Sequence, residues 1–447
     1  MRSIKRNLVL IVTILVCFIS GLIYLTYKIY RDSSFYMIHS ENAVLGKVYD
    51  RKENVLFDQK ATPDTYGADH FTDVASLIGN NDKQMTNTLV SNNLELLNNY
   101  SFSQGIHSAD GQSAVYTTLD HEANQKVYQA FGNKNGTAIA YNYVTGEILV
   151  CVSKPGLNPF NGYTDLEEGS LLCKAFYKFT PGSTQKISTL AAARASLGED
   201  LLNSMSFSCS GTYLNRGGQT IYCHNLSGHG EENISSAFAN SCNVFFAQLV
   251  EDDRFNLNDI INSYKKMGYS VNKSDPYVME INGISVQTAS TTLTDKYDFS
   301  TQWGCIGQGE TMVSPCMLMT WQSAIASETG KSVLPYLISY STRVDGSKEN
   351  FAEKSMSREF FDAPTAAYVK NIMIQNGQRY TDTIPGFTLG IKSGTAQVKN
   401  GDEENSLLTG FDTNPDHPIA FCVLIEDRHD GDIKTDSIVN TILTSLD

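Results

Sequence analysis

Residues 179–187 read Phe-Thr-Pro-Gly-Ser-Thr-Gln-Lys-Ile and lead directly into an apolar, alanine-rich run. The Pro-Gly pair breaks the chain, and a serine after it favours the start of a helix. Ile187 and Leu190 begin a helical repeat, so the sequence predicts Ser183 at a helix N-terminus with Lys186 one turn later on the same face. A serine becomes a nucleophile when a base takes its proton, and a lysine whose pKa is lowered by burial or a nearby cation is such a base.

The Ser-x-x-Lys spacing is weak evidence alone, because it also occurs at Ser263 with Lys266 and at Ser270 with Lys273. A helix cap followed by a solvated lysine explains any single copy. Residues 259–268 have the pattern of an amphipathic surface helix that ends at a glycine. Motifs elsewhere in the chain must therefore distinguish the first copy from the other two.

A Ser-x-Asn motif, Ser241-Cys242-Asn243, lies within residues 236–249, an apolar and aromatic stretch. Polar groups in such a stretch must be hydrogen-bonded or used in chemistry. Two interpretations stay open from these residues alone. Ser241 and Asn243 either bond to the buried backbone or belong to an active site.

A lysine lies within the predicted strand 388–398, at Lys392-Ser393-Gly394-Thr395, which is the only Lys-[Ser/Thr]-Gly sequence in the chain. Gly394 inside a strand indicates close approach by a backbone or a ligand. A lysine there can hold a carboxylate, and its charge can lower the pKa of another lysine. An edge-strand lysine beside a bulge glycine is the alternative interpretation.

Ser-x-x-Lys, Ser-x-Asn and Lys-Ser-Gly occur here in the order typical of penicillin-binding proteins and β-lactamases. The chain closely resembles the class B penicillin-binding proteins, the membrane-anchored D,D-transpeptidases of bacterial cell-wall synthesis. Residues 46–51, Gly-Lys-Val-Tyr-Asp-Arg, are similar to the family's juxtamembrane Arg-Gly-x-Ile-x-Asp-Arg element without its first arginine. Residues 307–309, Gly-Gln-Gly, and 313–315, Val-Ser-Pro, resemble its Gly-Gln-Gly…Thr-Pro segment with serine for threonine. Residues 143–150 resemble its opening hairpin, and the resemblance extends from about residue 46 to the end.

One departure follows the Lys-Ser-Gly strand, where the family usually has a Trp-Phe pair and this chain has Leu407-Leu408. It affects the acceptor side of the site and leaves the nucleophile untouched. The segment before residue 113 is short and resembles the compact subgroup that has no large pedestal domain.

The resemblance implies a catalytic role for several motif residues. Ser183 attacks the carbonyl between the last two D-alanines of a stem peptide, and Lys186 accepts its proton. Desolvation and the nearby charge of Lys392 are expected to keep this lysine neutral. Backbone N–H groups of Ser183 and Thr395 form the oxyanion hole. Ser241 relays a proton to the leaving amine.

The resemblance also implies how substrates and partners bind. Asn243 orients the amide of the donor peptide, while Lys392, Ser393 and Thr395, with Gly394 between them, position its terminal carboxylate. An amine of a neighbouring stem peptide then resolves the acyl-enzyme. The implied mechanism uses no metal and no organic cofactor. The implied partners are stem peptides ending in D-Ala-D-Ala, β-lactams and a membrane-spanning glycan polymerase.

Other functions share the same constellation: a serine β-lactamase, a β-lactam sensor and a non-catalytic cell-wall scaffold. A β-lactamase needs a water-activating glutamate, and none can be recognised in the sequence. A sensor needs a signalling segment beyond one short anchor, and the intact motif triplet argues against a scaffold.

Strands are predicted towards both ends of the region after residue 112, with mostly helices between them. The predicted fold class is α+β, a penicillin-binding/serine-β-lactamase-like transpeptidase domain in which an antiparallel sheet has flanking helices and a helical subdomain. The predicted strands are 113–119, 137–143, 147–153, 388–398, 407–411 and 418–425, and the helices flanking them are 122–131 and 436–446.

Residues 7–27 are nearly uncharged and long enough to cross a bilayer. Three basic residues precede the run and two follow it, which favours a cytoplasmic N-terminus and an extracytoplasmic remainder. No Ala-x-Ala site follows, so we expect an uncleaved single-pass anchor in the cell membrane. The expected organisation is a cytoplasmic N-terminus at 1–6, the anchor at 7–27, a small extended juxtamembrane module at 28–112 and the transpeptidase domain at 113–447.

The chain is acidic, with 34 Lys and Arg against 48 Asp and Glu and a net charge of −14. Phosphate backbones are bound by basic surfaces. The composition therefore argues against nucleic acid as a partner.

Two of the nine cysteines, Cys209 and Cys223, are separated by a short loop. They could form a disulfide, or Cys223 and His224 could join His229 and Cys209 in a zinc site, although the regular Cys-x-x-Cys spacing is missing. Unpaired structural cysteines are the third interpretation. All three stay open from the sequence, and the predicted catalytic set includes no metal ligand.

Overall fold

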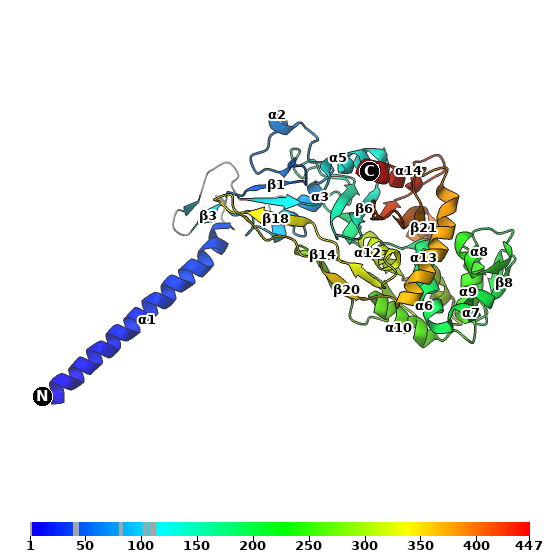
Figure 1. The fold of residues 1–447 in the computed structure, drawn as a ribbon, viewed down its shortest axis with the longest axis horizontal. Helices are drawn as coiled ribbons and strands as arrows, with labels where there is room; N and C mark the ends of the chain where they lie inside the picture. Colours follow the sequence, from blue (N-terminus) through cyan, green and yellow to red (C-terminus); the bar gives the residue numbers. More distant parts are fainter. Residues whose placement is uncertain (1, 39–43, 80–83, 102–104, 107–112) are drawn as a thin grey trace.

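The computed structural model describes residues 2–38, 44–79, 84–101, 105–106 and 113–447. A long helix, α1 (Arg2–Ile38), projects away from the folded body, and both five-stranded sheets lie within that body (Figure 1). Ser3–Ser33 of this helix is the one candidate membrane span among the described residues, and it contains the predicted run 7–27.

The central sheet has five strands, all antiparallel, in the order β21-β22-β23-β6-β7. Residues from the two ends of the predicted domain thus pair directly, which confirms the antiparallel sheet. The bounds are β6 Gly136–Asn142, β7 Ile148–Lys154, β21 Leu389–Val398, β22 Glu403–Asp412 and β23 Ile419–Ile425.

Helices cover both faces of this sheet. Its strands are therefore buried on both sides, and alternate residues enter two different cores. On one face lie α5 (His121–Ala130) and α14 (Thr435–Leu446). On the other lies α12 (Pro315–Ala326), in which every residue is buried, with α13 (Ala363–Gly377) beside the edge strand β21. The α+β prediction is confirmed.

A second five-stranded sheet, in the order β19-β18-β5-β1-β2, joins distant parts of the chain. The strand β1 pairs in parallel with β5, and β5 pairs antiparallel with β18. Strands on either side of residue 112 thus share one sheet, while residues 107–112, where the predicted domain boundary falls, lie outside the described residues. The strands are β1 Lys47–Tyr49, β2 Val55–Phe57, β5 Ala114–Thr117, β18 Ile338–Thr342 and β19 Lys348–Glu349.

The helix α1 continues through residues 28–38 of the predicted juxtamembrane module. Beyond it, the described part of the module holds only short elements, in keeping with its polar, asparagine-rich sequence. The carboxylate of Asp50, in the Gly-Lys-Val-Tyr-Asp-Arg element, is fully buried and accepts hydrogen bonds from N–H groups of Lys52, Asn54 and His121. It therefore ties this element to the start of α5. The short elements are α2 Pro63–Tyr66, α3 Ala75–Ile78, α4 Leu89–Asn92, β3 Tyr100–Ser101 and β4 Gly105–Ile106.

A helical insert lies between the two halves of the central sheet, as the sequence predicts. Its helix α10 ends at Gly268, which adopts a left-handed φ of 107°, so the surface helix predicted at 259–268 is confirmed. The insert's helices are α6 Lys186–Leu197, α7 Glu199–Ser204, α8 Ile234–Ala239, α9 Asn243–Glu251, α10 Leu257–Met267 and α11 Phe299–Ile306.

Small β elements complete the insert and its surroundings. Two hairpin-like pairs, β8 with β11 and β9 with β10, lie next to α9. The remaining strands are β8 Ser206–Cys209, β9 Thr212–Leu214, β10 Thr220–Tyr222, β11 Gly230–Asn233, β12 Tyr269–Val271, β13 Met279–Ile281, β14 Ile284–Val286, β15 Ala289–Thr291, β16 Met312–Val313, β17 Lys331–Val333 and β20 Met356–Glu359.

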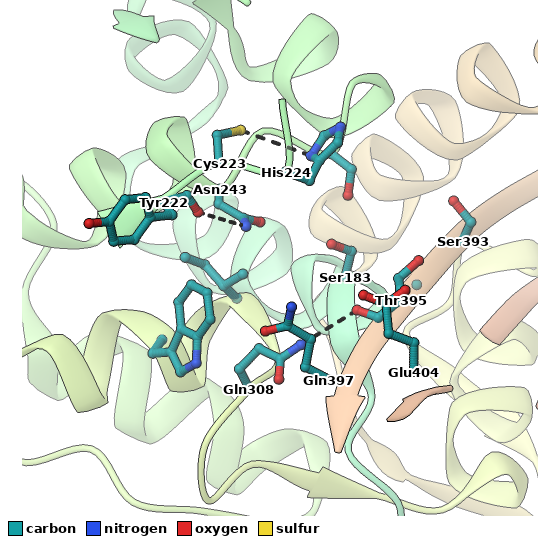
Figure 2. Close-up of a pocket in the computed structure, with 14 residues that line it drawn as sticks. Ser183, Tyr222, Cys223, His224, Asn243, Gln308, Ser393, Thr395, Gln397 and Glu404 are labelled. Carbon is teal, nitrogen blue, oxygen red and sulfur yellow. Dashed lines mark hydrogen bonds between the residues drawn. The ribbon is translucent and has the colours of Figure 1, made fainter. Parts of the chain in front are cut away.

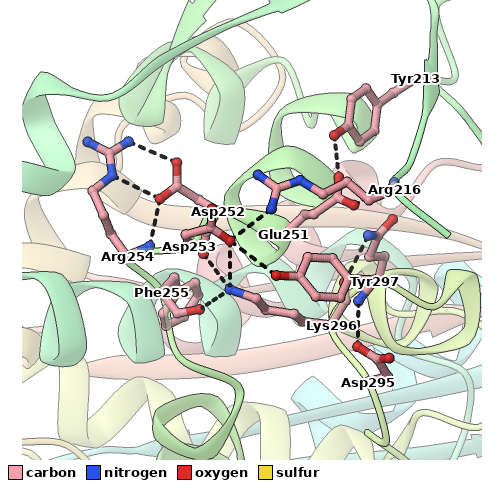
Figure 3. A network of polar contacts seen from close by, with 11 residues as sticks. Tyr213, Arg216, Glu251, Asp252, Asp253, Arg254, Phe255, Asp295, Lys296 and Tyr297 are labelled. Carbon is pink, nitrogen blue, oxygen red and sulfur yellow. Dashed lines mark hydrogen bonds and ion pairs between the residues drawn. The ribbon is translucent and has the colours of Figure 1, made fainter.

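A polar network fixes the C-terminal end of α9 (Figure 3). Buried Glu251 accepts hydrogen bonds from the hydroxyl of Tyr213 and from the backbone N–H of Arg216, 2.6 Å away. Lys296 donates to the carbonyls of Asp252 and Phe255, at 2.8 and 3.3 Å. The network holds α9 against the β9–β10 hairpin.

Candidate active site

Ser183 lies in a single 3-10 turn, Gly182–Gln185, that runs straight into α6. The serine thus lies at the N-terminal end of a continuous helical segment, as its sequence predicts, and Lys186 is the first residue of the α-helix. Gly182 has a φ of +52°, and a Cβ there would lie 2.4 Å from the carbonyl oxygen of Thr395. Only glycine allows this turn to pack so closely against β21.

Lys186 is completely buried beneath the serine. Its Nζ lies 2.7 Å from Oγ of Ser183, 2.8 Å from Oδ1 of Asn243, and 2.9 and 3.2 Å from the carbonyl oxygen and Oγ of Ser241. Burial lowers the pKa of Lys186 from 10.5 to about 7, because the charged form loses its hydration. The amine is therefore placed and tuned to exchange a proton with the serine.

Lys392, on β21, is the second buried lysine of the site. Burial first, and then the positive charges of Lys186 and Arg379, hold its pKa well below the ordinary lysine value. The sequence prediction attributed the neutrality of Lys186 partly to Lys392. In the structure burial is the main cause of the lowered pKa at Lys186, and the repulsion between the two amines is evident at Lys392.

Ser241 connects the two lysines from the turn between α8 and α9. Its Oγ lies 3.2 Å from Nζ of Lys186 and 3.1 Å from Nζ of Lys392. Its backbone has a φ of +55°, which is unfavourable for a serine and persists only when the surroundings impose it. The strained turn is what aims this hydroxyl into the site.

Asn243 is the first residue of α9. Its Oδ1 accepts a hydrogen bond from Nζ of Lys186, and its Nδ2 donates to the carbonyl of Tyr222 over 3.1 Å. The amide is thus held between the buried lysine and the end of β10, and one edge of it faces the cavity.

The edge strand β21 forms the opposite wall. Nζ of Lys392 donates to the carbonyl of Ser393 over 2.7 Å. A Cβ on Gly394 would lie 2.7 Å from the carbonyl oxygen of Pro181 and 3.0 Å from the backbone nitrogen of Thr184. The backbone that approaches this glycine, as predicted, is therefore that of the 3-10 turn carrying Ser183, called the serine turn below. Ser393 and Thr395 follow on the side of the strand that lines the cavity.

These residues surround a cavity of about 450 Å³ (Figure 2). The structure brings all eight predicted site residues together from three separate segments. Six of them line the cavity, and the two lysines lie buried beneath its floor. The six lining residues are Ser183, Ser241, Asn243, Ser393, Gly394 and Thr395.

Other lining residues were not predicted as site residues. Gln397 lies two positions beyond Thr395, so the two-residue period of the strand could have indicated it. Tyr222 and His224 come from the end of β10, and nothing in their local sequence places them opposite the serine. Glu404 reaches the cavity from β22.

The Gly-Gln-Gly segment supports the serine turn from behind. A Cβ on Gly307 would lie 1.8 Å from the carbonyl oxygen of Gly182, and the N–H of Gly182 donates to the carbonyl of Gly307 over 2.9 Å. Gln308 lines the cavity and lies with its Nε2 3.5 Å from the carbonyl oxygen of Thr395.

The Leu407-Leu408 pair lies in β22, directly opposite Gly394 and Ser393. Leu407 is buried in the core on one face of the sheet and Leu408 in the core on the other. The departure from the family's Trp-Phe pair therefore gives two packing residues that do not line this cavity.

The second Ser-x-x-Lys copy lies on the surface, as its pattern indicates. Ser263 is on α10, and Lys266 forms an exposed ion pair with Glu359. The third copy, at Ser270, begins in the short strand β12.

The fold and its triplet-lined cleft define a transpeptidase domain of the penicillin-binding and serine β-lactamase class. Residues 136–444 match the family described as "Penicillin binding protein transpeptidase domain". The chain belongs to this family, and the class B assignment is confirmed.

Individual relatives agree with this assignment. Penicillin-binding protein 3 of Bacillus subtilis is 25% identical over 346 residues, which are 71% of this chain and 49% of that protein, so the chain spans about half the length of this curated relative. The D,D-transpeptidase domain of a peptidoglycan glycosyltransferase from Eggerthella lenta has a TM-score of 0.71 at 19% identity, covering 90% of this chain and 98% of that one.

The penicillin G acyl-enzyme complex of penicillin-binding protein A from Mycobacterium tuberculosis has a TM-score of 0.74 at 18% identity. The similarity covers 91% of this chain and 100% of that one. At such identities these structures establish the shared fold.

Proposed function

We propose that this chain is a peptidoglycan D,D-transpeptidase that works through an acyl-enzyme on Ser183 and is acylated by penicillins at the same atom. The observation that carries the proposal is the pair formed by Ser183 Oγ and Lys186 Nζ, 2.7 Å apart, with the amine fully buried and its pKa lowered to about 7. A lysine with that pKa is substantially neutral near pH 7 and can take the serine proton.

In the acylation step Ser183 Oγ attacks the carbonyl carbon of the penultimate D-alanine while Lys186 takes the hydroxyl proton. Backbone N–H groups of Ser183 and Thr395 stabilise the oxyanion. The C–N bond then breaks, and the terminal D-alanine leaves after its nitrogen receives a proton through Ser241, which lies 3.2 Å from Lys186.

In the second step an amine of a neighbouring stem peptide attacks the ester. The amine gives up a proton to the Lys186–Ser241 pair, and Ser183 is released as its hydroxyl. Water takes no part in either step. Excluding water from the cleft therefore favours transfer of the acyl group to the amine over hydrolysis of the acyl-enzyme.

Substrate positioning follows from the same geometry. Ser393 and Thr395 line the cavity beside Gly394 and are placed to hold the terminal carboxylate, with Lys392 supplying positive charge beneath them. Asn243, oriented by Lys186 and Tyr222, presents its amide to the backbone of the donor peptide.

We also propose that the catalytic domain lies outside the cytoplasm, with residues 1–6 cytoplasmic, 7–27 in the membrane and 28–112 as a juxtamembrane module before the domain at 113–447. The candidate span Ser3–Ser33 supports the membrane anchor. A membrane-spanning glycan polymerase is the proposed partner, since cross-linking acts on newly made glycan strands at the membrane surface.

Labelling with a fluorescent penicillin tests the nucleophile. Wild type should label covalently, Ser183→Ala should not, and the matched change Ser263→Ala in the surface copy should label normally. Labelling of Ser183→Ala would overturn the assignment.

Two outcomes separate the rival functions. An adduct that clears within seconds would favour a β-lactamase, and a wild type that never labels would favour a scaffold. Release of D-alanine from a stem pentapeptide, together with transfer to a labelled amine acceptor, is the expected result for a transpeptidase.

A further inference from the structure

Four side chains converge just behind the Ser-Cys-Asn turn: Cys209, Cys223, His229 and Cys242. Their ligand atoms all lie within 4.8 Å of one another. The three thiols are at most 2% exposed, and His229 is half-buried. Three separate segments between residues 209 and 242 therefore deliver three sulfurs and one ring nitrogen to one point.

Three of the six separations between these atoms are close to those of a tetrahedral metal site. Nδ1 of His229 lies 3.6 Å from Sγ of Cys209 and 3.6 Å from Sγ of Cys223, and Sγ of Cys223 lies 4.0 Å from Sγ of Cys242. Zinc–sulfur bonds of about 2.3 Å and zinc–nitrogen bonds of about 2.0 Å at tetrahedral angles place neighbouring ligand atoms roughly 3.5–3.8 Å apart.

The loops that carry these residues interlock by close backbone contacts. Gly228 and Gly211 both have left-handed φ angles, and added Cβ atoms would lie 2.3 Å from the carbonyl oxygen of Cys209 and 2.0 Å from that of Leu226. The N–H of His229 donates to the carbonyl of Cys209 over 3.0 Å. Both loops are thus held with their ligand atoms facing each other.

A backbone N–H group points at one of the sulfurs. Sγ of Cys242 accepts a hydrogen bond from the N–H of Phe245 over 3.3 Å. Outer hydrogen bonds of this kind hold a ligand atom in its orientation.

The composition of the cluster separates a metal from a disulfide. All nine cysteines are free thiols in the structure. A Cys209–Cys223 disulfide would leave Cys242 and the ring nitrogen of His229 facing it with no role, whereas a metal uses all four groups. A closed set of three thiolates and one imidazole suits zinc and leaves no open position, as in structural sites.

We propose that Cys209, Cys223, His229 and Cys242 hold one structural zinc ion. The sequence suggested a possible zinc site with His224 in place of Cys242. In the structure His224 faces the active-site cavity beside Cys223 and lies outside the cluster (Figure 2).

The site explains how residues 206–233, which carry β8 to β11, and the neighbouring Ser-Cys-Asn motif are fixed. This region consists of two-stranded pairs and exposes apolar side chains such as Leu214 and Leu226, so it has little core of its own. A metal supplies the cross-link that such a region needs. Cys242 is the middle residue of Ser241-Cys242-Asn243, so the ion also anchors the strained turn that aims Ser241.

Metal content of the full chain, purified in detergent without chelators, tests the site. Wild type should carry about one zinc ion, as four ligands require. His229→Gln should lose it under a mild competing chelator, with at least a tenfold lower content. The matched control His429→Gln, at an exposed histidine outside the cluster, should keep it. A zinc-free wild type, or equal zinc in both variants, would overturn the proposal.

A second measurement needs no variant. Chelator treatment of the folded wild type should release zinc and expose three alkylatable cysteines together, and cobalt reconstitution should give the visible bands of a tetrahedral thiolate site. Protection of Cys209 and Cys223 from alkylation in denaturant without reductant would show a disulfide and overturn the zinc site.

The effect on the catalytic motif rests on the proposed function and has its own readout. Removing zinc should slow acylation by penicillin at least tenfold, and adding zinc back should restore it. A wild type that binds zinc but is not acylated would refute the proposed function and leave the metal site standing. A wild type that is acylated but binds no zinc would refute the metal site and leave the proposed function standing.

Discussion

At the scale of single residues, the site depends on two buried lysines that share one serine. Ser241 Oγ lies 3.2 Å from Nζ of Lys186 and 3.1 Å from Nζ of Lys392. Within the described chain neither lysine forms an ion pair with a carboxylate, so burial lowers the pKa of both. A shared hydroxyl between two such amines is a short route for a proton.

The pH dependence of acylation follows from Lys186. Its pKa is lowered from 10.5 to about 7, and only the neutral amine accepts the serine proton. The rate of acylation by penicillin should therefore rise with pH, reach half its maximum near pH 7 and level off above that. Stopped-flow measurement of the rate from pH 5 to 9 checks this, and a rate that is still rising steeply at pH 9 would refute it.

The substitution Lys186→Arg separates charge from base strength. Arginine keeps the positive charge but holds its proton throughout the working pH range. Acylation should fall by about 10²–10⁴-fold, the usual contribution of a general base. Lys266→Arg, in the surface Ser-x-x-Lys copy, is the matched control and should acylate at the wild-type rate. Normal acylation in Lys186→Arg would leave the proposed base without a role.

At the scale of elements, the site is a junction between a 3-10 turn, a strained inter-helix turn and an edge strand. The serine turn and β21 approach so closely that glycine is required on both sides, at Gly182 and Gly394. Their separation sets the distance between the N–H groups of Ser183 and Thr395. The backbone geometry of the proposed oxyanion hole thus depends on the absence of a side chain at both glycines.

Gly394→Ala should open this junction. Its Cβ would lie 2.7 Å from the carbonyl oxygen of Pro181, so β21 or the turn must move. A displacement of about 1 Å at a reacting centre costs on the order of 10²-fold, and the acylation rate should fall by about that factor.

The matched control is Gly401→Ala, in the turn that joins the same two strands. A Cβ at Gly401 meets nothing within 4 Å, so its left-handed φ of +95° affects stability alone. Acylation should stay at the wild-type rate in this variant. Equal acylation by Gly394→Ala and wild type would show that the junction tolerates the methyl group.

The elements differ in how far local sequence could predict them. The helix at 259–268 follows from its apolar period and its terminal glycine. The strands at 137–143 and 388–398 follow from short apolar runs bounded by turn residues, since both strands are largely buried on both sides. The pairing of β1 with β5 could not be predicted, since the sequence of a short strand does not indicate which distant strand it pairs with. The φ of +55° at Ser241 and the convergence of Cys242 with His229 also depend on long-range packing.

At the scale of the whole molecule, the second sheet connects the membrane segment to the catalytic domain. β1 follows the anchor helix by a short stretch of chain and pairs with β5, which pairs with β18 from deep within the C-terminal region. Buried Asp50 fixes the same element to the start of α5. The sheet and Asp50 therefore fix the first residues described after α1 to the domain that carries the cleft.

The side of the membrane on which that cleft lies depends on the charges around α1. Arg2, Lys5 and Arg6 precede the apolar run, against Lys28 and Arg31 after it, so the excess of one basic residue favours a cytoplasmic N-terminus. An alkaline phosphatase fused to the C-terminus is active only outside the cytoplasm, and the wild-type fusion should be active in a bacterial host. Changing all three leading residues to glutamine reverses the excess and should lower the activity per fusion chain several-fold. Changing Lys28 and Arg31 instead should keep it high, and an inactive wild-type fusion would place the cleft on the cytoplasmic side, away from any stem peptide.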